Sequence, residues 1–459
     1  MVLMQGCEKG YFDLNNNPNQ VTNPSLASLL TTTTHKTGIN SFTVGGIAAT
    51  YVQYTANPAA SGAGDTYQIV DYTGTWDALY LAMADIYDMK QTATTQNSSE
   101  YLGVADVLLS YHLTLVNDLW GSAPYANAFV TSTLTPSYDS GEELYTSSMA
   151  LIDEAIAELA KTTATIKLAA TSDLIHGGDR VKWLKTAYAI KARLLNKISK
   201  RPNYNAAAVL DAVDRSYTAN TDDAGMASFQ LRNNWAGVAL SNTNNTLGGW
   251  LSEQFIDHLN GTTYGIFDPR IRKITDPTVN GIFIGTVNGA GNRPPGNNTV
   301  KDENYITQSS PWTSPTAPLL IVTNAEIRFI EAEAALRANN LPRAYAAYLA
   351  GITANMNKLV VPAGAERTTY LSSPLVAVGE ANLTLDLIFK EKYISTYLNP
   401  EAWTDARRYN YRYKDFTLPV NAVLPSFIRR VDYPVGERSK NGANVPLVSA
   451  LTENLWWDK

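Results

Sequence analysis

The feature that most constrains the fold is a pair of adjacent helical patterns between Thr323 and Met356. In the first half, apolar residues recur every three or four positions behind Asn324, a residue that can cap a helix. Pro342 then ends this pattern, because proline suits the first turn of a new helix and not the interior of an old one. The second half carries small residues at every third position. The stretch therefore predicts two antiparallel helices in close contact.

Similar patterns recur along the chain. A helix pair of about 34 residues that packs through small side chains resembles a tetratricopeptide repeat, although an ordinary helical hairpin would give the same pattern. Helical patterning begins only at Thr75, after a Gly-, Thr- and Tyr-rich stretch. We predict a mainly α fold, in which residues 25–459 form one domain behind an extended tether at 1–24. The expected helix pairs lie at about 75–120, 140–217, 323–357 and 383–410.

Residues 220–322 interrupt the helix pairs with tryptophan and tyrosine residues set among Asn, Gly and Pro. A long irregular insertion on a helical scaffold is often a functional surface. Its run GTVNGAGNRPPG, from Gly285 to Gly296, resembles a phosphate-binding loop only superficially. It lacks the Lys-Ser/Thr ending and is followed by no helix start, so nucleotide binding is not expected.

The composition excludes some classes of ligand. The net charge of −6 and the absence of clustered Lys and Arg argue against a nucleic-acid partner. Only 17% of the 459 residues are charged, whereas tyrosine occurs 26 times and tryptophan nine times. Aromatic rings stack on sugar faces and amides bond hydroxyl groups, so this composition favours a neutral polyhydroxylated ligand.

Cys7 is the single cysteine, so the chain can form neither an internal disulfide nor a thiolate metal cluster. It follows Met1–Gly6, which is similar to the end of a lipoprotein signal peptide, and we expect it to be lipidated. A free cysteine in a flexible N-terminus is the alternative. The four histidines are scattered without paired spacing. No cofactor is therefore expected, and a structural calcium ion stays open.

Six stretches together resemble one family, the SusD/RagB outer-membrane lipoproteins of Bacteroidota, and in particular its SusD-like branch. They are residues 13–24, 117–128, 326–337, 389–411, 429–438 and the terminal LWWD. The resemblance implies a helical fold with four tetratricopeptide-like units and a lipid anchor at the cell surface. It also implies a seat on a SusC-like TonB-dependent outer-membrane transporter. Members capture a nutrient, usually an oligosaccharide and in some relatives a peptide, without catalysis.

The resemblance further implies an aromatic arc with amides and carboxylates, built by the segment before the first repeat helix and by the long insertion. The residues in these regions that we expect to bind the ligand are Tyr67, Asp71, Tyr72, Trp250, Tyr264, Asn304, Tyr305 and Trp312. Trp312 is the first choice, because the run SSPWTSP is expected to display it in a stiff loop. Replacing it with alanine should then weaken binding without lowering the melting temperature. A core position is the alternative for Trp312 and Tyr305, and it is the favoured interpretation for Tyr264 and Trp250.

Two rival functions are weighed against capture. A glycoside hydrolase needs two carboxylates about 5–9 Å apart, and Asp222–Asp223 and Asp302–Glu303 are available. Sequence neighbours rarely oppose each other across a cleft, so this rival is weak. The second rival is a cytosolic peptide-binding repeat scaffold, against which Cys7 argues. The charged motif at residues 401–408 is interpreted as ion pairs that lock two helices together, not as catalytic.

Overall fold

The computed structural model describes residues 24–129, 133–243, 249–293 and 302–459. About 51% of the chain is helical, and the described part holds fifteen α-helices and four short strands. This confirms the predicted mainly α fold with paired helices. Cys7 and almost all of the predicted tether lie outside the described residues.

The paired helices are α2 Thr73–Thr95, α3 Ser99–Trp120, α4 Gly141–Ala160, α5 Arg180–Lys197, α6 Ala206–Asp214, α10 Asn324–Arg337, α11 Leu341–Lys358, α13 Leu385–Ser395 and α14 Glu401–Arg408. The other helices are α1 Leu26–Tyr51, α7 Asn234–Thr243, α8 Glu253–Asn260, α9 Ile271–Ile274, α12 Ala365–Ser372 and α15 Val435–Asn441. The strands are β1 Thr55–Ala56, β2 Ala224–Met226, β3 Trp250–Leu251 and β4 Leu319–Val322. Strand β1 pairs antiparallel with β3, and β2 pairs antiparallel with β4.

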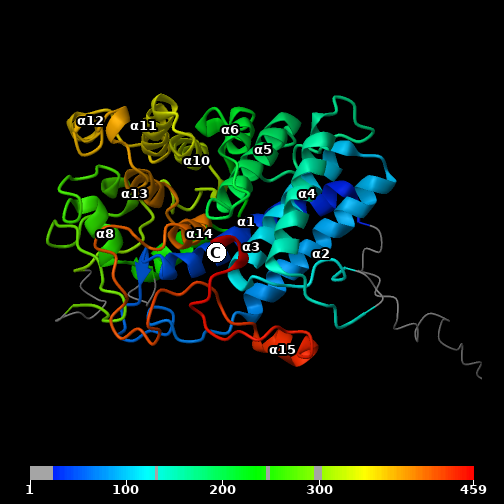
Figure 1. The fold of residues 1–459 in the computed structure, drawn as a ribbon, viewed down its shortest axis with the longest axis horizontal. Helices are drawn as coiled ribbons and strands as arrows, with labels where there is room; N and C mark the ends of the chain where they lie inside the picture. The colour runs from blue at the N-terminus through cyan, green and yellow to red at the C-terminus, as the bar shows by residue number, and fades with distance from the viewer. Residues whose placement is uncertain (1–23, 130–132, 244–248, 294–301) are drawn as a thin grey trace, which may run out of the picture.

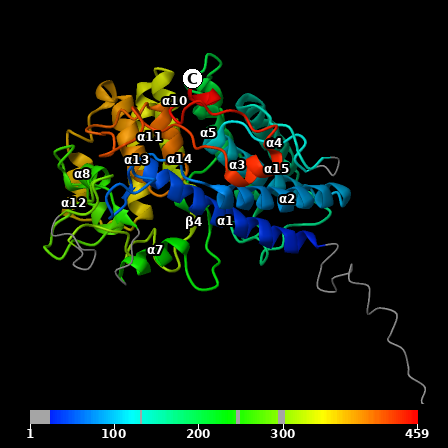
Figure 2. The same ribbon diagram turned by 90° about the horizontal axis from the view of Figure 1, so that it is seen from below.

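The helix pairs form one side of the molecule. In Figure 1 they follow one another from α2, α3 and α4 through α5 and α6 to α10, α11 and α12, while loops and α15 occupy the opposite side. Helix α1 runs along the length of this array in Figure 2 and contacts α2, α3, α14 and β4. The array therefore has a long internal helix as its support.

Helix α1 was not predicted, since its sequence is rich in threonine and glycine and carries no one-sided apolar stripe. Fifteen of its 26 residues are buried and none is exposed from Lys36 to Tyr51, so no amphipathic pattern is required of that part. The hydroxyl groups of Thr34 and Thr37 donate to the carbonyls of Leu30 and Thr33, at 2.6 and 2.7 Å. These bonds within the helix satisfy polar groups that would otherwise be buried without partners.

A cluster of buried ion pairs joins three of the helices. Arg408 of α14 makes a two-bond contact with Glu333 of α10, at 2.8 and 2.9 Å, and a third bond of 2.7 Å with Asp405. Lys392 of α13 contacts the same Asp405 at 2.8 Å. All four side chains are at most 3% exposed. The motif at residues 401–408 therefore locks helices together, as the sequence predicts, through a group we call the central ion cluster: Glu333, Lys392, Asp405 and Arg408.

The charges in the central ion cluster hold one another ionised. Burial would raise the pKa of the Glu333 carboxyl, but the guanidinium of Arg408 keeps it well below its ordinary value. Burial likewise opposes the charge on Arg408, whose pKa the carboxylates of Glu333 and Asp405 hold well above its ordinary value. Removing one partner would therefore leave an uncompensated buried charge.

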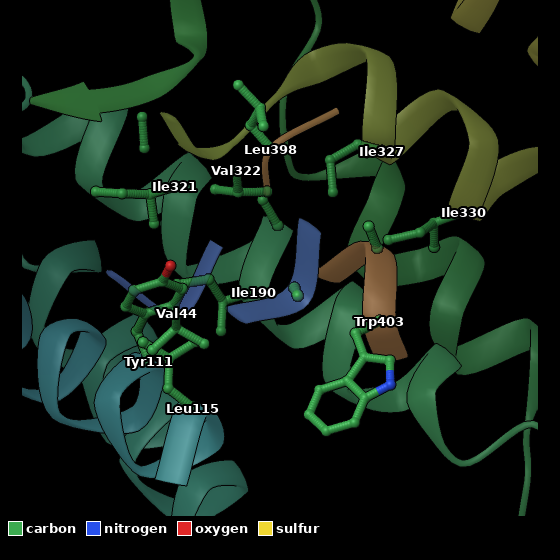
Figure 3. Packing of buried hydrophobic residues seen from close by; sticks show 14 of the residues in the cluster. Val44, Tyr111, Leu115, Ile190, Ile321, Val322, Ile327, Ile330, Leu398 and Trp403 are labelled. Atoms are coloured by element: carbon green, nitrogen blue, oxygen red, sulfur yellow. The ribbon is translucent and has the colours of Figure 1, made fainter. Parts of the chain in front are cut away.

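The apolar core continues through all of these elements. Figure 3 shows it as a close packing of side chains from α1, α3, α5, β4, α10 and α14. The labelled residues are Val44, Tyr111, Leu115, Ile190, Ile321, Val322, Ile327, Ile330, Leu398 and Trp403. Because segments far apart in the sequence share this core, the helix pairs are held as a single packed body.

Glu333→Gln is expected to lower the free energy of unfolding by about 3–5 kcal/mol, because it leaves Arg408 buried with one carboxylate fewer. Urea unfolding followed by circular dichroism measures the change. Glu366→Gln is the matched control, since Glu366 forms an ion pair with Arg272 in which both side chains are about half exposed. That variant should lose less than about 1 kcal/mol. Equal losses in the two variants would contradict the role of the central ion cluster.

Candidate functional site

A cleft of about 330 Å³ lies where α8 meets the turn after Thr286 and the loop 415–420. We call it the α8 cleft. Its polar lining is formed chiefly by Gln53, Glu253, Gln254, Asp257, Asn288 and Asp415. Figures 1 and 2 place α8 at the end of the molecule opposite the start of α1. Amide and carboxylate groups therefore gather in a hollow at one end of the helical array.

The position of the cleft is set by α13. The hydroxyl of Tyr393 in α13 donates to the carbonyl of Val52 at 2.8 Å, which fixes the segment that carries Gln53. The next residue, Tyr54, accepts a 3.0 Å bond from the amide of Ser252. Ser252 is the N-cap of α8, and its side chain accepts from the amide of Gln254. A continuous set of bonds thus connects the packed helices with the helix that forms one wall.

Three loops are joined to one another around Asn288. Its side-chain amide donates to the carbonyl of Thr55 at 2.9 Å, and its own carbonyl accepts from the amide of Val420 at 2.9 Å. Gln53 makes a second connection by donating to the carbonyl of Thr417 at 2.7 Å. The walls of the cleft are therefore held by specific hydrogen bonds between loops that are distant in sequence.

The glycine-rich run beside Asn288 allows this close approach of the loops. Gly289 has a φ of +81°, and a Cβ there would lie 1.9 Å from the carbonyl oxygen of Val420. Gly291 has a φ of +77°, and a Cβ there would lie 2.7 Å from the carbonyl oxygen of Pro58. Only glycine fits both the backbone conformation and the space. The glycines thus serve backbone packing between loops.

The charges of the cleft are mainly negative. Glu253 forms an ion pair with Arg293 at the rim. Asp257 accepts a 2.9 Å bond from the side chain of Asn260, and burial raises the pKa of its carboxyl. Asp415 is exposed and stands on a backbone with a φ of +58°, an uncommon conformation for a residue other than glycine. The cleft therefore presents hydrogen-bond acceptors to a ligand.

A neutral histidine lies behind Gln254, one of the residues that line the cleft. His258 is 1% exposed, and burial lowers its pKa to about 3. One ring nitrogen lies 2.8 Å from the side-chain amide of Gln254, and the ring contacts Tyr264 edge-on at a centroid distance of 4.8 Å. Tyr264 is half-buried and lies below Lys390. Of the predicted rings, Tyr264 thus comes nearest to the cleft, yet it is not among the residues that line it.

Trp312 does not occupy the displayed position predicted for it. Its side chain is only 6% exposed and contacts Tyr397 edge-on. The space beside it measures about 10 Å³, room for about one water molecule. The loop turns inward because Ser310 accepts from the amide of Trp312 and Thr313 donates to the carbonyl of Thr307. The expected surface display is therefore wrong, and ligand contact by Trp312 stays a prediction without that support.

Trp250, Asn304 and Tyr305 are brought together by the structure, but two of them are buried. Trp250 is 2% exposed, lies in β3, and contacts the half-buried ring of Tyr305 at 5.8 Å. Asn304 is 1% exposed and accepts from the amide of Ile284 while donating to the carbonyl of Asp276. Burial thus contradicts an exposed position for Asn304 in an aromatic arc and agrees with the core interpretation of Trp250, because both side chains serve the packing of the insertion.

The three residues predicted before the first repeat helix lie elsewhere. Tyr67 is 1% exposed and packs against Tyr51, which contradicts an exposed position. The half-buried Tyr72 bonds the hydroxyl of Tyr51 at 2.8 Å. Asp71 is exposed and accepts bonds from Thr73 and from the amide of Val435, so it joins two loops. None of the three lines the α8 cleft.

Sequence reasoning missed the residues that do line the cleft. The long insertion was singled out, but for its aromatic rings and not for Gln254, Asp257 or Asn288. Asp415 belongs to a C-terminal loop for which the sequence analysis predicts no ligand contact. A single acidic residue within the aromatic run YRYKDF was nevertheless a signal of a turn. The cleft is lined by residues from three distant segments, so no local sequence pattern predicts it.

Three of the four carboxylates considered for a hydrolase are engaged in the scaffold. Asp222 pairs with Lys185, Asp223 pairs with Lys358, and Glu303 accepts from Arg293. No group of three His, Cys, Asp or Glu side chains in the described ranges is arranged to hold a metal ion. Within the same ranges, no helix has the length and apolar character needed to cross a membrane.

Gly289→Ala is expected to lower the free energy of unfolding by about 2–4 kcal/mol, because the added methyl group meets the carbonyl of Val420 on a strained backbone. Gly281→Ala is the matched control. Gly281 has a similar φ of +73°, but a Cβ there meets nothing within 4 Å. The Gly281→Ala variant should lose about 1 kcal/mol of unfolding free energy, which comes from the backbone conformation alone. Similar losses in both variants, measured by urea unfolding, would contradict the close approach of the two loops.

Trp312→Ala is expected to lower the free energy of unfolding by about 3–5 kcal/mol, because it opens a cavity in the core. Differential scanning calorimetry would show a lower melting temperature. Leu231→Ala, at a position in the same insertion that is 87% exposed, should change stability by no more than about 0.5 kcal/mol. An unchanged melting temperature for Trp312→Ala would support a displayed loop instead.

Comparison with known proteins shows which family has this architecture. A SusD-like family model, described as "Starch-binding associating with outer membrane", matches residues 16–434. Among solved structures, a SusD/RagB family protein from Bacteroides thetaiotaomicron is 21% identical, with 95% of this chain and 99% of that chain covered and a TM-score of 0.77. A chitin-binding SusD homologue from Flavobacterium johnsoniae is 20% identical, with 95% and 98% covered and a TM-score of 0.78.

A SusD homologue from Bacteroides fragilis is likewise 20% identical, with 95% of this chain and 99% of that chain covered and a TM-score of 0.77. No curated protein matches the chain. The structural likenesses show a shared fold, and the family model spans most of the sequence. The chain is therefore a member of the SusD-like family.

Proposed function

We propose that this SusD-like chain captures an oligosaccharide in the α8 cleft and delivers it to a SusC-like TonB-dependent transporter. It acts as a binding protein without catalysis. The observation that carries the proposal is the cleft itself, a hollow of about 330 Å³ lined by amide, hydroxyl and carboxylate groups in a member of a family described as starch-binding. Such groups accept hydrogen bonds from the hydroxyl groups of sugars.

The size of the cleft supports capture of one part of a chain at a time. A volume of about 330 Å³ is at the lower end of small-molecule sites. A few hydrogen bonds in an open hollow give roughly micromolar affinity. Weak binding of this kind suits a protein that must release its cargo. The structural relative from Flavobacterium johnsoniae, which is named as chitin-binding, is consistent with a glycan as the ligand.

A peptide ligand is the second candidate from the sequence, and the described cleft gives it less support. An extended peptide commonly binds by adding a strand to a free sheet edge. Trp250 in β3 pairs with Ala56 on one side and bridges to Tyr305 on the other. Both edges of this strand are thus occupied, whereas side-chain acceptors in the cleft remain open to sugar hydroxyl groups.

Exposed apolar residues beside the cleft support docking of a transporter. Ile69, Val420 and Val423 are 72%, 46% and 59% exposed, and the amide of Val423 bonds the carbonyl of Thr66, which brings the two loops together. Grouped apolar side chains on a surface are typical of a protein interface. Cys7 lies outside the described residues, and we propose that its acylation anchors the chain at the outer membrane. One diacylglycerol would supply the two acyl chains that stable attachment requires.

Thr262→Trp tests the site, because the exposed Thr262 lines the α8 cleft and a large ring there fills it. We expect the affinity for the glycan that the wild type binds best on an oligosaccharide array to fall more than about tenfold, as measured by calorimetry. Thr353→Trp is the matched control, in a separate groove lined by α10 and α11. It should leave affinity unchanged. Binding that survives Thr262→Trp, or is lost equally in the control, would contradict the assignment of the cleft.

A further inference from the structure

We propose that the α8 cleft recognises a protonated primary amine on its sugar ligand, and thus prefers an amino sugar to a neutral or acidic glycan. This inference rests on the proposed function and specifies the ligand class of the same site. It follows from which hydrogen-bonding atoms of the cleft are already used by the protein and which are left for a ligand.

The amide donors of the cleft are turned toward the protein. Gln254 uses its side-chain nitrogen for the ring of His258, at 2.8 Å, and for the carbonyl of Lys414, at 3.2 Å. As noted above, the side-chain nitrogens of Gln53 and Asn288 donate to the carbonyls of two other loops. Each of the three lining amides therefore directs a donor to a fixed protein partner.

Two side-chain acceptors of the cleft are left open, whereas the Oδ1 of Asn288 accepts from the hydroxyl of Ser252 at 2.5 Å. The side chain of Gln254 is 9% exposed, and its Oε1 accepts no hydrogen bond from the described residues. The Oγ1 of Thr263, a side chain that is 5% exposed, is likewise without a partner in the part of the chain that the structure describes. Both residues line the cleft. Neither oxygen is enclosed by protein, so both are reached by solvent and can accept a hydrogen bond from a ligand.

Two carboxylates add negative charge without an ion-pair partner, although Arg293 lies near enough to Asp257 to oppose the effect of burial on its pKa, and the ammonium of Lys414 donates to the carbonyl of Thr263 at 2.6 Å. Asp257 and Asp415 line the cleft and form no ion pair within the described ranges, whereas Glu253 has Arg293 as its partner. No lysine or arginine is among the lining residues. An ammonium group carries three donors, no acceptor and one positive charge, which complements both properties of the cleft. A carboxylate or sulfate would meet repulsion and find few donors.

The negative character is local and does not merely reflect the net charge of the chain. A second hollow of equal volume, about 330 Å³, lies beside the start of α12 and is lined by Arg272, Lys273 and Arg367. The two hollows thus differ in the sign of their charges while their sizes agree. An amino sugar is favoured over a lysine side chain of a peptide because both edges of β3, next to the cleft, are already paired.

The test compares two probes of equal length by calorimetry at low salt and at a pH where the amine is protonated. One probe is a glucosamine oligosaccharide and the other is its N-acetylated, uncharged counterpart. The wild type should bind the charged probe about tenfold more tightly, since a charge-assisted bond is worth more than a neutral one. The preference should shrink as salt is raised.

Asp257→Asn and Asp415→Asn should each weaken binding of the charged probe roughly tenfold and change binding of the uncharged probe less than about twofold. Asp211→Asn, at an exposed site on α6, is the control that should change neither. Melting temperatures confirm that the variants are folded, and the comparison of the two probes on the wild type needs no variant.

Equal or tighter binding of the uncharged probe would overturn the amine assignment and leave glycan capture standing. A preference for the charged probe that survives in both acidic-site variants would also overturn it. Tighter binding of a lysine-containing peptide of similar length and charge would contradict the assignment to a sugar. If no glycan on the array binds at all, the proposed function fails together with this inference.

Discussion

The central ion cluster is the interaction on which the rest of the structure depends. Its charges are removed from water, so they stabilise the fold only when every partner is in place. They fix α14 against α10 and α13. From α13 the hydroxyl of Tyr393 reaches the segment that carries Gln53, and from there the backbone reaches the first turn of α8. The groups that line the α8 cleft are therefore positioned by the same contacts that hold the helix pairs together.

The aromatic and the polar residues of the long insertion have different roles in this arrangement. Its aromatic rings are used mostly to pack loops onto the helical array, as Trp250 and Trp312 show by their burial. Its short polar side chains remain at the surface of the cleft. A site built from amides and carboxylates is specific through the number and direction of its hydrogen bonds. Such a site distinguishes ligands by their donors and charge more than by their flat faces.

The fold was predictable where helices are half-exposed, as α10 and α11 show through their spacing of apolar and small residues. Helix α1 was missed because its second half, from Lys36 onward, has no exposed residue and so needs no such periodicity. The family was recognisable from motifs spread over the whole chain. The site was not, since the inward turn of the Trp312 loop depends on a hydrogen bond that Ser310 accepts from the amide of Trp312 and on one that Thr313 donates to Thr307. Asp415 and Asp257 meet only through tertiary packing, which no local pattern encodes.

The central claim is that cargo is held in the α8 cleft at the end of the helical array. A crystal structure of the protein soaked with the oligosaccharide that it binds tests this claim most directly. If cargo is held there, the crystal should show density for a sugar between α8 and the loop 415–420, with hydrogen bonds to Gln254 and to at least one of Asp257 and Asp415. A sugar seated instead on Tyr72, Tyr305 or any other ring outside that cleft would contradict it.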